Sequence, residues 1–119
     1  MLNNSLFAVA IDCADATSLA RFWGSVLGWQ VAETSTAERA VLLAAAGDSH
    51  EPCMVFSQVP EPKTAKNRLH LDLISDTFDR ETERLLSLGA QRLRDQQAGT
   101  SRWTTFTDIE GNEFDLIAG

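Results

Sequence analysis

The sequence is poor in cysteine and in basic residues. Its 119 residues include two cysteines, Cys13 and Cys53, and ten Lys and Arg against 17 Asp and Glu, for a net charge of −7. Two cysteines make a poor disulfide framework, so we expect both to be partly buried thiols. Because phosphate binding needs clustered Lys and Arg, the acidic balance argues against nucleic acid and anionic membranes as partners. A small molecule or a protein is the expected partner.

The sequence also lacks a long hydrophobic run. No apolar stretch approaches the length of a membrane span, and residues 1–5 carry no basic residue of the kind that opens a signal peptide. We therefore expect a cytoplasmic protein with no membrane segment. A length of 119 residues suits one domain, since it allows a shared core but is small for two independent ones.

What the sequence does contain is an internal repeat. Asp15 opens an amphipathic stretch that closes at Leu27-Gly28, Asp76 opens another that closes at Leu88-Gly89, and both intervals are 61 residues. This repetition predicts two similar modules within one domain covering 1–119. We place the first module at about 5–59, a polar, proline-containing linker at 60–67 and the second module at about 68–118. The modules are expected to pack together or to exchange across a dimer.

Each module is predicted to run strand, helix and three further strands. In the first module, large apolar residues recur at three- and four-residue spacing over 16–27, between Asp15 as a helix cap and Gly28 as a terminator. Its strands are predicted at 6–13, 29–35, 39–46 and 54–59. The second module repeats the order with a strand at 68–75, a helix at 77–88, a short strand at 90–94, a polar loop through Gly99 and strands at 102–107 and 113–118. The pattern predicts an α+β fold of two βαβββ modules.

Candidate catalytic residues lie in the second module. Strict alternation puts Leu69, Leu71 and Leu73 on one face of a strand and leaves His70 and Asp72 on the other. The same alternation separates the acidic pair from its apolar neighbours in the segment Glu113-Phe114-Asp115-Leu116.

If the two polar faces coincide, His70 and Glu113 approach one another. An imidazole and a carboxylate suit either a divalent metal or acid–base catalysis. The pair is an incomplete metal set, because a catalytic metal normally takes three protein ligands. A histidine between leucines can equally hydrogen-bond a neighbouring carboxylate near the surface and do no chemistry.

The repeat allows the same positions to be compared in the first module. At an interval of 61 residues the counterpart of His70 is Val9, which cannot coordinate a metal, and the candidate counterparts of Glu113 include no carboxylate. The first module is therefore expected to bring an apolar wall to a cleft that the second module lines with polar groups. The residues expected to contact a ligand there are Phe7, Val9, Ile11, Asp72, Trp103 and Asp115.

These features together resemble a known superfamily. The paired modules, the stretch with Asp15, Phe22-Trp23 and Leu27-Gly28-Trp29, and the closing Asp108-Ile109-Glu110-Gly111-Asn112-Glu113-Phe114 resemble the vicinal oxygen chelate (VOC) superfamily, which includes glyoxalases, extradiol dioxygenases, fosfomycin-resistance enzymes and bleomycin-binding proteins. Its glyoxalase-like branch is the most similar, and the resemblance covers nearly the whole chain. It implies curved mixed sheets with helices on the outer face, commonly paired in a homodimer.

The resemblance also implies metal ligands on the first and last strands of each module. His70 and Glu113 match the second-module ligand positions, whereas Val9 stands where a first-module histidine or glutamine would be. Two main hypotheses of function, and a third ranked below them, follow. One is a metal-free protein that binds a small, partly aromatic or cationic molecule. The other is a lyase, isomerase or dioxygenase in which His70 and Glu113 hold Zn, Mn, Fe or Ni. A third is that His70 acts as a general base without metal, with Glu113 or Asp72 orienting its ring.

Overall fold

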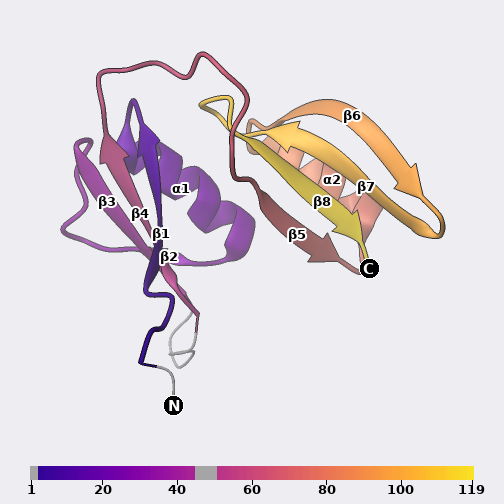
Figure 1. The fold of residues 1–119 in the computed structure, drawn as a ribbon, viewed down its shortest axis with the longest axis horizontal. Helices are drawn as coiled ribbons and strands as arrows, with labels where there is room; N and C mark the ends of the chain where they lie inside the picture. The colour runs from indigo at the N-terminus through magenta and orange to yellow at the C-terminus, as the bar shows by residue number, and fades with distance from the viewer. Residues whose placement is uncertain (1–2, 45–50) are drawn as a thin grey trace. The chain divides into compact units, whose positions relative to one another are not determined.

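The computed structural model describes residues 3–44 and 51–119, and the chain divides into two compact units, residues 1–62 and 63–119. Each unit consists of one sheet and one helix (Figure 1). The predicted α+β fold of two βαβββ modules is confirmed. A helix able to cross a membrane is absent from the described residues.

The first unit is a four-stranded mixed sheet with the strand order β1-β4-β3-β2. Its elements are β1 (Ala8–Cys13), α1 (Ala16–Leu27), β2 (Gln30–Val31), β3 (Arg39–Leu43) and β4 (Cys53–Gln58). β1 and β4 are parallel, and the other pairs are antiparallel. The helix begins where the Asp15 side chain accepts the backbone N–H of Ser18, and it ends at Gly28, whose φ of 70° favours glycine.

The core of the first unit lies between α1 and one face of its sheet. The helix contributes Leu19, Phe22, Trp23 and Val26, and the sheet contributes Ala40, Leu42, Met54 and Phe56. The close approach of the two layers leaves little space at Gly24, where an added Cβ would lie 3.2 Å from Leu42 Cδ1. Side chains in register with Leu42 therefore face the helix.

The second unit repeats this arrangement with the strand order β5-β8-β7-β6. Its elements are β5 (Leu71–Ser75), α2 (Phe78–Ser87), β6 (Gln91–Ala98), β7 (Ser101–Thr107) and β8 (Glu113–Ala118). Again the first and last strands are parallel. α2 contributes Phe78 and Leu85 to the core, and the sheet contributes Phe106, Phe114 and Leu116.

Some predicted boundaries in the second unit are wrong. The strand predicted at 68–75 begins only at Leu71, and Leu69, expected on the buried face, is 86% exposed. The cause is the partner strand, because β8 starts at Glu113 and the first paired residues are Leu71 and Phe114. Alternation in the sequence continues past the point where the ladder ends.

The polar stretch before Gly99 is a strand and not a loop. β6 continues to Ala98 and forms a hairpin with β7, and Gly99, with φ 61°, lies in the turn. β6 is an edge strand, so its side chains are largely exposed and its composition is polar. In the first unit the strand predicted at 29–35 is only Gln30–Val31, and the end of the strand predicted at 39–46 lies outside the described residues.

Candidate functional site

The face of the second sheet opposite α2, called here its helix-free face, carries most of the predicted polar residues. In β8, Phe114 and Leu116 are buried on the α2 side, so Asp115 between them points to the helix-free face. Asp72 of β5 is the register partner of Asp115 and shares that face. The sheet register therefore brings together two carboxylates that are 43 residues apart in sequence.

His70 joins these two carboxylates. Its Nδ1 atom lies 2.7 Å from Asp72 Oδ1 and 4.0 Å from Asp115 Oδ2. One potential ligand atom from each of the three residues lies within 4.8 Å of the other two. We call His70, Asp72 and Asp115 the polar triad. The His70 and Asp72 side chains are 42% and 48% exposed and Asp115 is 17% exposed, so the triad is accessible to solvent.

Two further side chains hold Asp115 in place. Thr105 of β7, the cross-strand partner of Asp115, donates its hydroxyl to Asp115 Oδ1 over 2.6 Å. Gln96 of β6 in turn donates its amide to Thr105 Oγ1 over 3.2 Å. This chain of hydrogen bonds crosses three strands and restricts the carboxylate to one orientation. Thr105 and Gln96 were not identified from the sequence, because only the register places them beside Asp115.

An apolar row lies next to the polar one. Ile117 of β8 is in register with Ile74 of β5 on one side and with Trp103 of β7 on the other. Ile74 is 73% exposed, and Ile117 and Trp103 are half-buried. One face of this sheet therefore combines a polar row with an apolar row, and the cleft predicted between the two modules stays a prediction.

Glu113 is held by the segment that precedes β5. Its carboxylate accepts the backbone N–H of Asn67 over 3.3 Å and lies 3.6 Å from Lys63 Nζ, and its own N–H is donated to Asn67 Oδ1 over 2.9 Å. Burial opposes ionisation of Glu113, but the backbone hydrogen bonds and the charges of Lys63 and Lys66 outweigh it and lower its pKa. The cluster around His70 contains Asp115 and not Glu113, so the predicted pairing of His70 with Glu113 stays a prediction.

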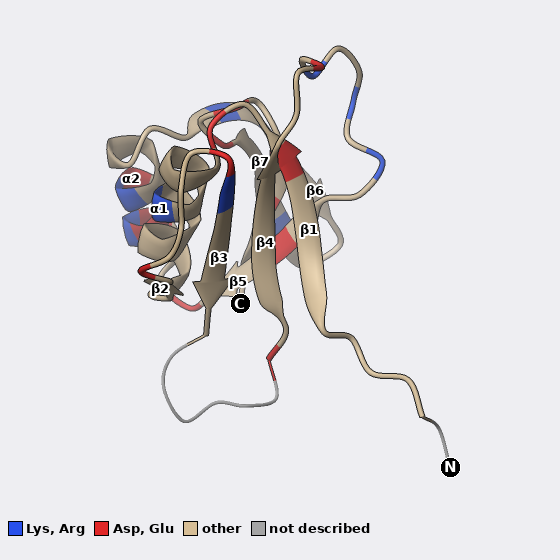
Figure 2. Cartoon of the chain, turned by 90° about the vertical axis from the view of Figure 1, so that its left-hand side faces the viewer, with Lys and Arg blue, Asp and Glu red and all other residues tan. Residues whose placement is uncertain are grey.

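The first sheet carries a different set of residues at the equivalent positions. The helix caps Asp15 and Thr77 are 62 residues apart, which makes Ala8 and Ala10 the counterparts of His70 and Asp72. Ala10 pairs with Val55 in the same type of parallel ladder that joins Asp72 to Asp115. The strands of this sheet are uncharged over most of their length, with charged residues near their ends (Figure 2).

The assignment of Val9 as the counterpart of His70 is therefore wrong by one residue. Val9 and Ile11 are in register with Met54 and Phe56, which are buried beneath α1, so they lie on the helix-covered face. A shift of one residue along a strand transfers every side chain to the other face. Phe7 precedes β1 and is 80% exposed. Ligand contacts of Phe7, Val9 and Ile11 stay predictions.

The family of the chain follows from comparison with known proteins. The family model described as a glyoxalase-like domain matches residues 8–117. The chain therefore belongs to the glyoxalase-like domain family of the VOC superfamily, as its sequence resemblance predicted. No curated protein matches the chain.

Solved structures show the same fold at low sequence identity. A glyoxalase/bleomycin resistance protein/dioxygenase family enzyme from Burkholderia phytofirmans is 18% identical with a TM-score of 0.76, over 97% of this chain and 98% of that one. The fosfomycin resistance protein FosX from Mesorhizobium loti is 20% identical with a TM-score of 0.71, over 100% and 94%. A variant of FosX from Listeria monocytogenes, complexed with Mn(II) and 1S,2S-dihydroxypropylphosphonic acid, is 16% identical with a TM-score of 0.76, over 100% and 92%.

The donor chemistry of the polar triad fits a divalent metal. One imidazole nitrogen and two carboxylates are ligand types that Zn and Mn accept, and three protein ligands are the usual number at a catalytic site. In the first sheet, Ala8, Ala10 and Val55 offer no ligand atom, and the Cys53 thiol lies 3.7 Å from the carbonyl oxygen of Phe7. Within the described residues, the cluster of potential metal ligands lies in the second unit.

Proposed function

We propose that this glyoxalase-like protein binds a small organic molecule on the helix-free face of its second sheet, without a complete two-module metal site. The observation that supports the proposal best is the adjacency of the polar triad to the row formed by Ile74, Ile117 and Trp103. Ligand sites in proteins typically combine apolar walls with a few convergent polar groups.

The charge of the polar triad favours a cationic ligand. Two carboxylates against one histidine leave this part of the face negative at neutral pH, and Asp72 is accessible enough to accept a hydrogen bond. An amine or amidine would donate to Asp72 and Asp115, while an attached ring would lie on Trp103 and Ile117. Thr105 keeps Asp115 oriented, which lowers the entropic cost of binding.

A panel of aromatic amines tests this proposal, with neutral analogues of the same shape as controls. Binding is followed by tryptophan fluorescence and by amide chemical shifts in NMR spectra. We expect saturable binding of at least one amine, weakened about tenfold by Asp115→Asn because a charge-assisted hydrogen bond is lost. Asp79→Asn, which makes the same charge change at a 92% exposed side chain on α2, should leave the affinity unchanged. Folded protein that responds to no member of the panel would contradict the proposal.

The expected homodimer and cytoplasmic location belong to the same proposal. Both come from the family resemblance and from composition. Sedimentation equilibrium tests the homodimer, and the expected mass is twice 13.1 kDa. A monomer at micromolar concentration would rule out the dimer without affecting the ligand test.

A second candidate function is divalent-metal-dependent lyase, isomerase or dioxygenase activity. The compactness of the polar triad, within 4.8 Å, favours it, and the related FosX variant carries Mn(II). A bound metal would polarise neighbouring oxygen atoms of a substrate. His70, Asp72 and Asp115 would hold the metal, and Thr105 would orient one ligand from behind.

Calorimetric titration with Zn(II) and Mn(II) tests the metal candidate. We expect stoichiometric binding that is lost in both His70→Ala and Asp115→Asn and retained in Glu113→Gln, since Glu113 is engaged with Asn67 and Lys63. Loss in Glu113→Gln as well as in His70→Ala would instead support the His70–Glu113 pair predicted from the sequence. Absence of binding at micromolar metal would contradict any metal-dependent function and leave the organic-ligand proposal in place.

A further inference from the structure

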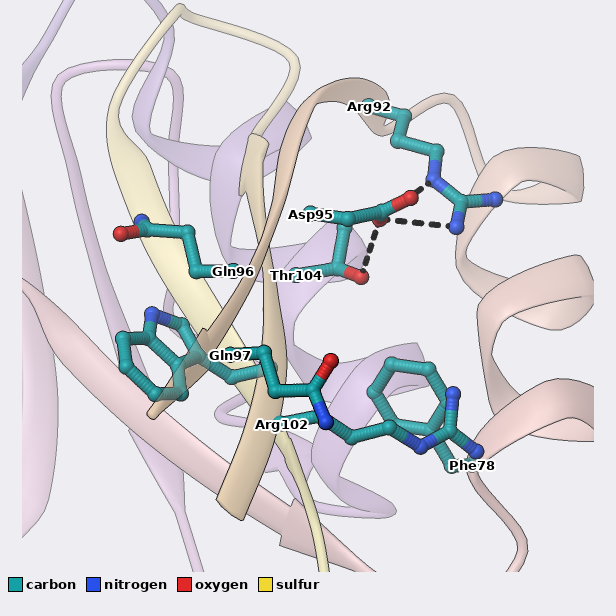
Figure 3. A pocket seen from close by; sticks show the side chains of 8 residues that line it. Phe78, Arg92, Asp95, Gln96, Gln97, Arg102 and Thr104 are labelled. Atoms are coloured by element: carbon teal, nitrogen blue, oxygen red, sulfur yellow. Dashed lines mark hydrogen bonds and ion pairs between the residues drawn. The ribbon is translucent and has the colours of Figure 1, made fainter. Parts of the chain in front are cut away.

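A second candidate site lies where the β6–β7 hairpin meets the start of α2. It is a cavity of about 280 Å³, lined among others by Phe78 of α2, Arg92 and Asp95 of β6, and Arg102 and Thr104 of β7 (Figure 3). Thr104 and Phe78 are buried residues of the α2-covered side. Its charged groups therefore belong to the opposite side of the sheet from the polar triad.

Two of the charged side chains in this cavity neutralise each other. Arg92 donates from Nε and Nη2 to the same oxygen of Asp95, over 3.1 and 2.8 Å, and Thr104 donates its hydroxyl to that oxygen over 2.7 Å. The Thr104 hydrogen bond and the neighbouring Arg92 lower the pKa of Asp95, so it stays ionised at neutral pH. The remaining charge of the lining is the positive charge of Arg102.

Arg102 is held in place by an aromatic ring. Its guanidinium carbon lies 4.4 Å from the centroid of the Phe78 ring, and Figure 3 shows the guanidinium against that ring with the Gln97 side chain nearby. Stacking uses the flat face of a guanidinium and leaves its N–H edge available. Arg102 Nη2 forms an ion pair with Asp79 Oδ1 at 3.8 Å, a distance too long for a hydrogen bond.

We propose that this cavity binds a small aromatic carboxylate, with Arg102 as its anchor. The planar carboxylate matches the fork of the guanidinium, the Gln97 amide supplies a further donor, and the ligand ring lies beside Phe78. The volume limits the ligand to about the size of one ring. The chain as a whole has a net charge of −7 and Asp79 pairs with Arg102, but the Asp79 side chain is 92% exposed, so salt screens this ion pair and a ligand carboxylate can replace Asp79 at the guanidinium.

Titration of the full chain with sodium benzoate tests the proposal by NMR at constant ionic strength. We expect saturable shifts of the Arg102 Nε–H, the Gln97 side-chain amide and the Phe78 backbone amide, with a Kd on the order of 1–10 mM for so small a ligand. Benzamide, which has the same shape without the charge, should bind more weakly. Benzylamine should not shift these three signals.

Two variants and a matched control locate the anchor. Arg102→Gln should weaken benzoate binding about tenfold, and Arg102→Lys should weaken it about threefold because charge is kept and the fork is lost. Arg21→Gln, the same charge change at an exposed position of α1, should bind like the wild type. Retained amide dispersion in each spectrum shows that the variant is folded. Shifts that do not saturate, equal affinity of Arg102→Gln and wild type, or shifts centred on Asp115 and Ile117 would each overturn the proposal.

Discussion

The two sheets carry different residues at the same position of their parallel strand pair. In the first sheet, Ala10 of β1 pairs with Val55 of β4, and in the second Asp72 of β5 pairs with Asp115 of β8. The helix-covered sides remain alike, with a buried large residue at the equivalent helix positions Trp23 and Leu85. The difference shows that at this ladder position only the second module carries ionisable side chains, while packing beneath the helix is common to both.

The physical reason is that the two faces of each sheet are under different constraints. A residue beneath α1 or α2 must be apolar and of the right volume, because a change of even one methylene alters core packing. A residue on a helix-free face meets no such requirement within its unit. The helix-free faces can therefore differ without loss of the fold.

The largest expected effect is on the free energy of unfolding, through the packed helix side chains that both units contain. Trp23→Ala should lower the free energy of unfolding by about 3–5 kcal/mol and Leu85→Ala by about 2–5 kcal/mol, because each removes a fully packed side chain. Urea denaturation measures both, and Arg21→Ala on the exposed side of α1 is the control. If Trp23→Ala costs no more than Arg21→Ala, the assignment of the first core is wrong.

The next prediction tests which face each residue of β1 occupies. Val9→Asp should lower the free energy of unfolding by about 2 kcal/mol more than Ala10→Asp does. The reason is that Val9 lies beside buried Met54 beneath α1, whereas Ala10 is exposed. Thermal or urea unfolding of both variants gives the comparison. Equal costs, or a larger one for Ala10→Asp, would restore the 61-residue correspondence in which Val9 is the counterpart of His70.

A smaller effect on the free energy of unfolding is expected for Thr105, whose hydroxyl orients the Asp115 carboxylate. Thr105→Val keeps the shape of a 3% exposed side chain but removes the hydroxyl donated to Asp115, and it should cost about 1–2 kcal/mol. Thr107→Val, on the same strand and face but half-buried and paired with Glu113, is the matched control. A similar loss in both variants would mean that the hydrogen bond to Asp115 contributes nothing specific.

The smallest effect on the free energy of unfolding is expected for Glu113, which connects β8 to the segment before β5. Its pKa is lowered from 4.5 in the folded chain, so its ionised form contributes stability that is present above that value and is lost as the pH falls through the lowered pKa. The free energy of unfolding of the wild type should exceed that of Glu113→Gln by no more than about 1 kcal/mol at pH 7. The difference should shrink below pH 4.5.

Urea denaturation of the two proteins from pH 7 to the acid limit of folding measures this difference. A gap that widens as the pH falls would contradict the sign of the pKa shift. Asp79→Asn, at a largely exposed carboxylate, controls for the general effect of removing one negative charge.

Local sequence patterns were sufficient to predict the fold and much of its detail. The two amphipathic stretches predicted both helices, with the bounds of α1 matched at Ala16 and Leu27, whereas α2 is capped by Thr77 and not by Asp76. The strand at 113–118 was also readable from alternation. These features depend on local backbone preferences and on hydrophobic periodicity, which a sequence states directly.

Which side chains meet depends on the pairing of distant strands. Alternation placed His70, Asp72, Glu113 and Asp115 on polar faces, but the parallel register of β5 and β8 placed Asp72 beside Asp115, and the segment before β5 engaged Glu113. The same register corrected the interval between the sheets by one residue, moving the counterpart of His70 from Val9 to Ala8. Strand register depends on pairing between distant segments, and a one-residue difference reverses every face, so no local pattern can establish it.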